Sequence, residues 1–285
     1  MTLVVKDLSK KYGKQEALDS ISLQIDNKKI YGLLGRNGAG KTTLLNIISQ
    51  RINPSHGEVR LDHRNLQNDQ TARQQVYLMN EMLWFNPGDK VKTNYQVLDQ
   101  IMGGFDWDFA NQLAESFGLD LSKKFKSLST GYRSIGQLIA ALCVSAEYVF
   151  LDEPVLGLDA NHRHLFNSKL LEAYDRRPRT FVISTHIIEE IAFLLERVII
   201  IDQGRLLQEA SIDDILSMGH ILRGPSDLVD LLSHDLKIVG REKLGSLQEV
   251  AVLGDIPSDL PEEIQVASLG LQEYFVYITN QKGAE

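Results

Sequence analysis

The sequence predicts an α/β fold with a mainly parallel β-sheet and a phosphate-binding loop. Short apolar runs at 148–151, 179–183 and 198–201 are typical of strands buried on both faces of a parallel sheet. Apolar residues at helical spacing fill the stretch 97–144, which indicates several amphipathic helices before the first of these strands. A glycine-rich stretch, G-R-N-G-A-G-K-T-T, occupies residues 35–43 between a strand-like run and a helix-like run.

The glycine-rich stretch matches the phosphate-loop pattern G-x-x-x-x-G-K-[ST], which here ends on Lys41 and Thr42. Glycines let the backbone curl so that its N–H groups point at phosphate oxygens, and the following helix N-terminus adds a partial positive charge. Lys41 can reach the β- and γ-phosphates of a nucleotide, and the Thr42 hydroxyl can ligate Mg²⁺. The alternative is a glycine turn that only caps a helix, and the strand and helix that flank the motif disfavour it. The nucleotide-binding residues predicted from this loop are Gly35, Asn37, Gly38, Ala39, Gly40, Lys41, Thr42 and Thr43.

Composition and charge narrow the class of protein. The 285 residues suffice for one large domain plus an appendage, and 43% hydrophobic residues suffice for a packed core. Because 38 acidic residues face 30 basic ones, the net charge is −8, and no nucleic-acid partner is expected. The apolar runs are too short to cross a bilayer, and the first residues lack the features of a signal peptide. The single cysteine, Cys143, is expected to be a buried thiol in a cytoplasmic chain.

Two parts are predicted along the chain. Residues 1–208 form the α/β unit, with an antiparallel β part near the N-terminus, strands at 58–61 and 76–79, and an inserted helical subdomain at about 83–146. A helix is expected at 187–197, before the last strand of this unit. Prolines and glycines break residues 209–285 into short pieces, which indicates a small α+β appendage.

A phosphate loop alone does not separate a kinase from a GTPase or a motor, but four further residues narrow the class. The apolar run at 148–151 ends in Asp152 and Glu153, where the first acid can hold the Mg²⁺ shell and the second can polarise an attacking water. Ser129 precedes a helix and can act both as an N-cap and as part of an anion site. His186 follows the strand at 179–183 and should face the ligand crevice of an open α/β sheet. Alone, Ser129 would more often be an ordinary cap and His186 an ordinary surface residue, whereas the phosphate loop upstream disfavours a plain solvated strand-end acid at Glu153.

Taken in this order, the pieces resemble the nucleotide-binding domain of ABC (ATP-binding cassette) ATPases over about residues 1–208. The stretch 35–43 resembles the Walker A loop, and 148–153 resembles Walker B with Glu153 as the catalytic glutamate. The stretch 128–132 resembles the LSGGQ signature, 155–159 resembles the D-loop, and His186 resembles the switch histidine. Tyr12 resembles the aromatic residue that stacks on adenine, a role for which a flat ring is chemically suited.

The resemblance implies a P-loop NTPase core of the RecA-like kind that uses ATP and Mg²⁺. Such domains work as head-to-tail pairs, so Ser129 and Gly131 would contact the γ-phosphate bound by the partner chain. Lys41, His186 and Glu153 would be the catalytic residues, and Thr42 and Asp152 would hold the metal. Positioning and electrostatic stabilisation would then suffice for hydrolysis.

Three departures from the family pattern stand out. The signature reads L-S-T-G-Y, which keeps Ser129 and Gly131 but changes the loop around them, and the D-loop has Leu156 where a serine is common. The glutamine expected after the strand at 76–79 is missing. Asn80 stands at that position and could reach Mg²⁺ through its side-chain carbonyl, while Glu81 is the alternative. Because this loop commonly couples the ATP site to a membrane partner, the change concerns coupling more than binding.

The insert and the tail resemble those of ATPase subunits of bacterial ABC-2-type exporters. The stretches 105–109 and 117–120 and the tail segment 271–279 carry this likeness, although plain amphipathic helices would look similar. An integral membrane permease is therefore the expected partner, with the aromatic stretch 82–85 in its docking groove or in the core. The subunit would pair as a homodimer or heterodimer and lie on the inner face of the cell membrane.

Two alternatives remain open at the level of sequence. One is an ABC ATPase that drives no transport, such as one acting in cofactor assembly. The other is a binding module that has lost hydrolysis, which the intact Lys41, Asp152, Glu153 and His186 argue against. A metal site at His162 and His164 is not expected, because the pair has no cysteine or acidic companions, and both are expected on a helix surface.

Overall fold

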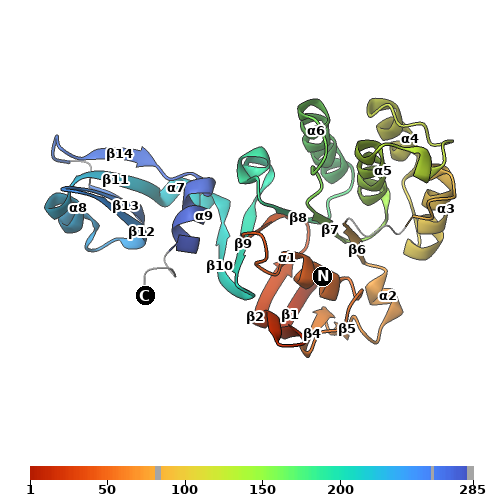
Figure 1. Cartoon of the computed structure of the whole chain (residues 1–285), viewed down its shortest axis with the longest axis horizontal. Coiled ribbons are helices and arrows are strands. Elements are labelled where there is room, and N and C mark those ends of the chain that lie inside the picture. Colours follow the sequence, from red (N-terminus) through yellow and green to blue (C-terminus); the bar gives the residue numbers. More distant parts are fainter. Residues whose placement is uncertain (81–84, 258–259, 281–285) are drawn as a thin grey trace.

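The computed structural model describes residues 1–80, 85–257 and 260–280, which build three sheets and the helices around them (Figure 1). The first sheet is antiparallel, with the order β2-β1-β4-β5. Buried residues alternate with more exposed ones at Leu3 and Val5 of β1 and over residues 21–25 of β2, which is the pattern of a sheet with one face on a core. The antiparallel β part predicted from the sequence is confirmed. Its strands are β1 (Thr2–Tyr12), β2 (Gln15–Asp26), β4 (His56–Leu61) and β5 (Arg64–Asn65).

The second sheet is the mainly parallel one and has the order β10-β9-β3-β8-β7-β6. Its inner strands β3, β7 and β8 are buried at every residue, which explains their apolar composition. Since parallel strands end at the same edge, the residues that follow β3, β6, β7 and β8 come together there. The strands are β3 (Ile30–Leu34), β6 (Val76–Met79), β7 (Tyr148–Asp152), β8 (Thr180–Thr185), β9 (Arg197–Asp202) and the antiparallel β10 (Arg205–Ser211).

Helices cover the second sheet and form the predicted insert (Figure 1). The phosphate loop leads into α1 (Lys41–Ile48), whose apolar side chains pack between the first two sheets. Cys143, the last residue of α5, is buried as predicted, and burial raises the pKa of its thiol. Phe85 is also buried, edge-on to Tyr95 and Phe125, while residues 82–84 of the same aromatic stretch lie outside the described residues. The other helices are α2 (Gln70–Arg73), α3 (Val91–Met102), α4 (Trp107–Ser116), η1 (Phe125–Ser127), α5 (Thr130–Cys143) and α6 (Ala160–Arg176).

The helix predicted at 187–197 is wrong. The segment forms two single 3₁₀ turns, η2 (Ile188–Glu190) and η3 (Ala192–Leu194), and Arg197 already belongs to β9. Its buried residues Ile188, Ile191 and Leu194 recur every third position, which fits three residues per turn better than the α-helical period.

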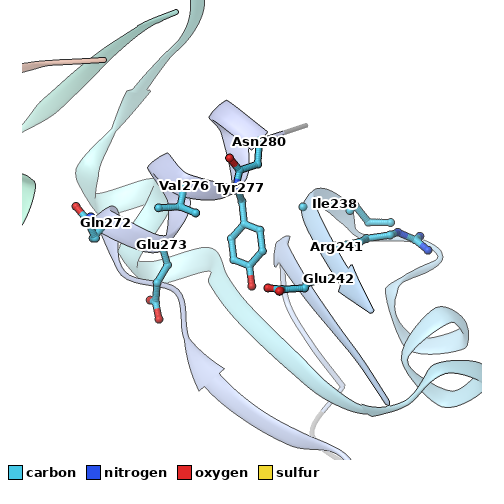
Figure 2. A pocket seen from close by; sticks show the side chains of 9 residues that line it. Ile238, Arg241, Glu242, Gln272, Glu273, Val276, Tyr277 and Asn280 are labelled. Atoms are coloured by element: carbon cyan, nitrogen blue, oxygen red, sulfur yellow. The ribbon is translucent and has the colours of Figure 1, made fainter. Parts of the chain in front are cut away.

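The C-terminal part is a four-stranded antiparallel sheet with three helices, the α+β appendage expected from the sequence. Helix α9 lies against β12, because Gly240 leaves room for the ring of Tyr277. Figure 2 shows the cavity of about 680 Å³ that opens beside this contact, with Tyr277 pointing from the helix toward the strand that carries Glu242. The elements are α7 (Ile212–Met218), β11 (Gly219–Pro225), α8 (Ser226–Ser233), β12 (Lys237–Leu244), β13 (Leu247–Leu253), β14 (Gln265–Ser268) and α9 (Leu271–Asn280).

The appendage is joined to the α/β unit by shared packing. Leu271 and Tyr274 of α9 belong to the same buried cluster as the helical insert and the second sheet. At the end of α9, the Asn280 side-chain oxygen accepts a hydrogen bond of 2.8 Å from Arg36 of the phosphate loop. Strand β10 continues to Ser211, so the expected boundary at residue 208 falls within a strand of the second sheet.

Candidate nucleotide site

The phosphate loop connects β3 to α1 through a tight turn whose backbone is left-handed at two of its glycines. Gly38 and Gly40 have φ angles of 83° and 105°, in the left-handed region that side chains other than glycine rarely adopt. Lys41 begins α1 and folds back over the loop, where its ammonium donates to the Gly35 carbonyl oxygen at 2.6 Å. Burial lowers the pKa of Lys41, and the nearby charges of Glu153 and Asp152 oppose that shift. The loop therefore holds a desolvated cation next to backbone N–H groups, an arrangement that suits a phosphate chain.

A cavity of about 570 Å³ opens over this loop, within the range of small-molecule sites. Tyr12, the last residue of β1, lines it with half of its surface exposed. The turn between β9 and β10 braces the opposite side, since Gly204 N–H donates to the Ala39 carbonyl at 3.0 Å. The cavity is lined by Tyr12, Gln15, Glu16, Ala17, Arg36, Asn37, Gly38, Ala39, Gly40, Lys41, Thr42, Thr43, Glu153, Gln203 and Gly204.

Three predicted catalytic and metal-binding positions meet at the carboxyl ends of β7 and β8. Asp152 ends β7, and Glu153 follows it with a φ angle of 50°, its N–H held by the Ser184 carbonyl at 2.9 Å. His186 follows β8, and its Nδ1 lies 3.0 Å from Glu153 Oε2. Because an ionised carboxylate only accepts hydrogen bonds, this contact places the ring proton on Nδ1. The strained turn at Glu153 thus aims its carboxylate at His186 on the side where Lys41 lies.

The residues near this edge fit a magnesium ion. Asp152 is buried, and its Oδ1 has no hydrogen-bond partner in the described structure, so a ligand of the opposite charge would satisfy it. Thr42, on the first turn of α1, is exposed toward the cavity. In the described residues, no group of three or more histidine, cysteine or acidic side chains could hold a metal alone. Mg²⁺ commonly takes one or two protein ligands and completes its shell with phosphates and water, so Asp152 and Thr42 would suffice to hold it.

The signature residues lie apart from this cavity. Ser129 caps α5 by accepting from Tyr132 N–H at 3.3 Å, as its position before a helix predicted. Neither Ser129 nor Gly131 lines the cavity over the phosphate loop. Within one chain, Ser129 and Gly131 therefore lie outside the cavity that the phosphate loop lines.

The unusual tyrosine of the signature has a partner that the sequence did not reveal. The Tyr132 ring meets the imidazole of His162 edge-on at 6.3 Å, and Phe117 stacks on the same imidazole at 6.1 Å. His162 Nδ1 also lies 2.8 Å from Asp159 Oδ2, and Asp159 caps α6. Instead of a plain surface residue, His162 is half-buried and ties the signature loop to the D-loop.

Asn80 occupies the predicted place after β6, but its side-chain oxygen is engaged. Arg51 donates a short hydrogen bond to Asn80 Oδ1 and a second bond of 2.5 Å to the Leu78 carbonyl. Asn80 in turn donates to Asn46 Oδ1 at 3.3 Å. The alternative residue, Glu81, lies outside the described residues. Arg51 was not predicted, since a single arginine after a helix carries no sequence signal of such a role.

In the described parts of the chain, none of the helices combines the length and apolar character that crossing a bilayer requires.

Comparisons with known proteins all find ATP-binding proteins of ABC transporters. Residues 18–156 match the family model described as ABC transporter. The chain is 32% identical over 213 residues to the bacitracin transport ATP-binding protein BcrA of Enterococcus faecalis, covering 74% of this chain and 69% of that one. It is 29% identical over 205 residues to the taurine import ATP-binding protein TauB of Escherichia coli, covering 71% and 80%.

A solved structure has the same fold. The dimeric bacterial ABC transporter cassette MJ0796 superposes with a TM-score of 0.64 at 21% identity, over 74% of this chain and 98% of that one. The match supports the α/β P-loop core with its antiparallel part and helical insert, as the sequence predicted.

Proposed function

Because the chain belongs to the family of ABC transporter ATP-binding proteins, we propose that it is the energy-coupling subunit of an ABC transporter. As a member of this family it binds ATP and is an ATPase. The proposal adds the residues that perform hydrolysis, the head-to-tail dimer, the membrane partner and a location on the inner face of the cell membrane.

One observation carries the catalytic part of the proposal: Lys41, Glu153 and His186 converge on the edge where the parallel strands end. Lys41 would bind the β- and γ-phosphates, and Thr42 and Asp152 would hold Mg²⁺, which neutralises charge on those phosphates when bound. Tyr12 would stack on the adenine. The backbone N–H groups from Gly35 to Thr43 would complete the phosphate cradle.

Glu153 is the proposed base because its carboxylate lines the cavity over the phosphate loop and lies 3.0 Å from His186 Nδ1. It would accept a hydrogen bond from the attacking water as the water approaches the γ-phosphate. His186, with its proton on Nδ1 and bonded to Glu153, keeps that carboxylate in position and leaves Nε2 to face the phosphate. The protein then acts mainly by positioning the water and the γ-phosphate and by stabilising the charge of the transition state, as in other phosphoryl transfers.

Dimerisation explains why Ser129 and Gly131 lie off the cavity of their own chain. In a head-to-tail pair, the α5 N-terminus of one subunit would face the phosphate loop of the other, where its N–H groups and Ser129 suit an anion. The dimeric state of the cassette MJ0796 supports this arrangement. The mass of the intact dimer distinguishes a homodimer of this chain from a heterodimer with a related subunit.

A groove of about 360 Å³ between α1, β6 and α3 is the proposed dock for a membrane permease. Two apolar side chains on α3, Val97 and Ile101, are about half exposed, which suits an apolar partner helix. Arg51 and Arg73 add positive charge to the groove wall. We propose export as the direction, on the likeness of residues 105–120 and 271–279 to exporter subunits. A substrate assay in inverted membrane vesicles tests it, and uptake into right-side-out vesicles would overturn it.

Two substitutions test the ATPase assignment. Glu153→Gln should keep ATP affinity and lower turnover by about a hundredfold or more, because the base is lost while the cradle stays. It should also trap an ATP-held dimer on size-exclusion chromatography. Lys41→Ala should abolish ATP binding in a calorimetric titration. Turnover of Glu153→Gln at the wild-type rate would remove Glu153 from the role of base.

Purification from native membranes tests the partner. An integral membrane permease should co-purify with the wild-type chain, and Ile101→Glu in the groove should release it without changing ATP affinity. Recovery with soluble assembly factors and no membrane protein would favour the non-transport alternative.

A further inference from the structure

Asn80 lies where a metal ligand is expected, one residue beyond β6 and next to the strand that ends in Asp152. It is buried, and it lines a cleft of about 310 Å³ together with Asp152, Glu153 and Gln137. Its only potential metal ligand is the side-chain oxygen, since the amide nitrogen is a donor. The direction of that oxygen therefore decides whether Asn80 joins the metal shell.

Arg51 controls that direction. Its guanidinium donates from Nη1 to Asn80 Oδ1 and from Nη2 to the Leu78 carbonyl, so one planar fork grips two acceptors at the end of β6. On the other side, the Asn80 amide donates to Asn46 Oδ1, and Asn46 donates to the Thr42 carbonyl at 2.8 Å. Both ends of the Asn80 side chain are thus held, with the oxygen turned toward Arg51.

The same guanidinium reaches the surface on the other side of β6. Arg51 and Leu78 line the groove between α1, β6 and α3, whereas Asn80 lines the catalytic cleft. Burial lowers the pKa of Arg51 to about 10, with Tyr77 and Asp152 opposing the shift, so the side chain stays charged at neutral pH. One charged group is therefore in contact with both the groove and the residue beside Asp152.

We propose that Arg51 is a positioning residue that keeps the Asn80 oxygen out of the metal shell until an acceptor in the groove draws the guanidinium away. Release would let Asn80 turn its oxygen toward a metal ion that Thr42 and Asp152 would hold. The link to the groove rests on the proposed permease partner, whereas the hold of Arg51 on Asn80 does not. A permease segment with a carboxylate or helix C-terminal carbonyls would be the matching occupant, because those groups accept from a guanidinium.

The test measures metal affinity without turnover. Mn²⁺ replaces Mg²⁺, and free Mn²⁺ is followed by electron paramagnetic resonance in the full chain with saturating ATP and the Glu153→Gln substitution. Four chains are compared in that background: the parent, Arg51→Met, Asn80→Ala and the variant that combines the two substitutions. Arg51→Met should tighten Mn²⁺ by about tenfold, because a freed carbonyl joins the shell. In the Asn80→Ala chain the same substitution should change nothing.

Two results would overturn the proposal. The first is weaker Mn²⁺ binding in Asn80→Ala with Arg51 intact, since Asn80 would then already be a ligand. The second is an equal effect of Arg51→Met with and without Asn80, which would mean that Arg51 acts through charge alone. Arg51→Lys is the control for misfolding, because it keeps the positive charge but lacks the planar fork of the guanidinium. It should tighten Mn²⁺ binding less than Arg51→Met, and only when Asn80 is present. Because this cycle uses no permease, it can succeed or fail independently of the transport proposal.

Discussion

Replacing glycines of the phosphate loop by alanine separates backbone strain from steric contact in the nucleotide-free protein. Gly38 and Gly40 both have positive φ angles, 83° and 105°. A side chain in the left-handed region costs about 1–2 kcal/mol at either position. The surroundings differ, since a Cβ on Gly38 meets nothing within 4 Å, whereas one on Gly40 would lie 2.7 Å from the Ala17 carbonyl oxygen and 2.8 Å from Leu18 Cδ2. Gly38→Ala is thus a matched control for strain alone.

The extra cost of Gly40→Ala comes from β2, whose backbone cannot move aside as a flexible side chain would. Overpacking of this kind adds about 1–3 kcal/mol. We therefore expect the free energy of unfolding to fall by about 1–2 kcal/mol in Gly38→Ala and by about 2–5 kcal/mol in Gly40→Ala. Urea unfolding followed by far-ultraviolet circular dichroism measures both losses in the absence of ATP. An equal loss in the two variants would refute the contact between the phosphate loop and β2.

Three further outcomes test other parts of the structure. His162→Ala should weaken the ATP-held dimer of Glu153→Gln, because the signature loop loses its tie to the D-loop, and the exposed His164→Ala should leave the dimer unchanged on size-exclusion chromatography. Arg179→Met should lower the free energy of unfolding by about 3 kcal/mol, because the buried guanidinium satisfies carbonyls at the end of α5, and Arg179→Lys should lose less. Burial, the largest single influence, would raise the pKa of Glu249, but the hydrogen bonds from Arg223 and Tyr277 together with the charge of Arg223 outweigh it, and the net shift is downward. Its carboxylate thus stabilises the fold above the unfolded pKa of about 4.3 and loses this effect as the pH falls through the lower folded value. Glu249→Gln should therefore flatten the acid limb of thermal stability below about pH 4.5.

Local pattern was sufficient for most of the α/β unit. The strands at 76–79 and 148–152 and the helices of the insert are long or apolar enough that periodicity alone identifies them. The phosphate loop, Glu153 and His186 each follow a buried strand of the parallel sheet, and Asp152 ends one, so their places in the fold could be predicted from the sequence, while their roles stay predictions. Topology, which brings those strand ends to one edge, then assembles the site. Period also explains the wrong helix at 187–197, since buried apolar residues spaced by three, as at Ile188, Ile191 and Leu194, occur in both 3₁₀ turns and α-helices.

Contacts between distant segments could not be predicted in this way. Arg51 and Asn80 are 29 positions apart in the sequence, and His162 and Phe117 are 45 positions apart. No short motif joins such pairs, because the contact depends on how α1 lies against β6 and how α6 lies against α4. The departures from the family pattern at Asn80 and Tyr132 were visible in the sequence. Their compensating partners became visible only when the three-dimensional packing was known.

The C-terminal appendage also makes contacts with distant segments that the sequence does not predict. Its composition separates it from the rest of the chain, yet α9 returns to the α/β unit and buries Tyr274 in the main core. The last turn of that helix then reaches the phosphate loop, where Asn280 accepts from Arg36. Arg36 lines the cavity over the phosphate loop, so the last described helix contacts one residue of that cavity wall. The appendage therefore touches both the main core and the edge of this cavity, which composition alone could not predict.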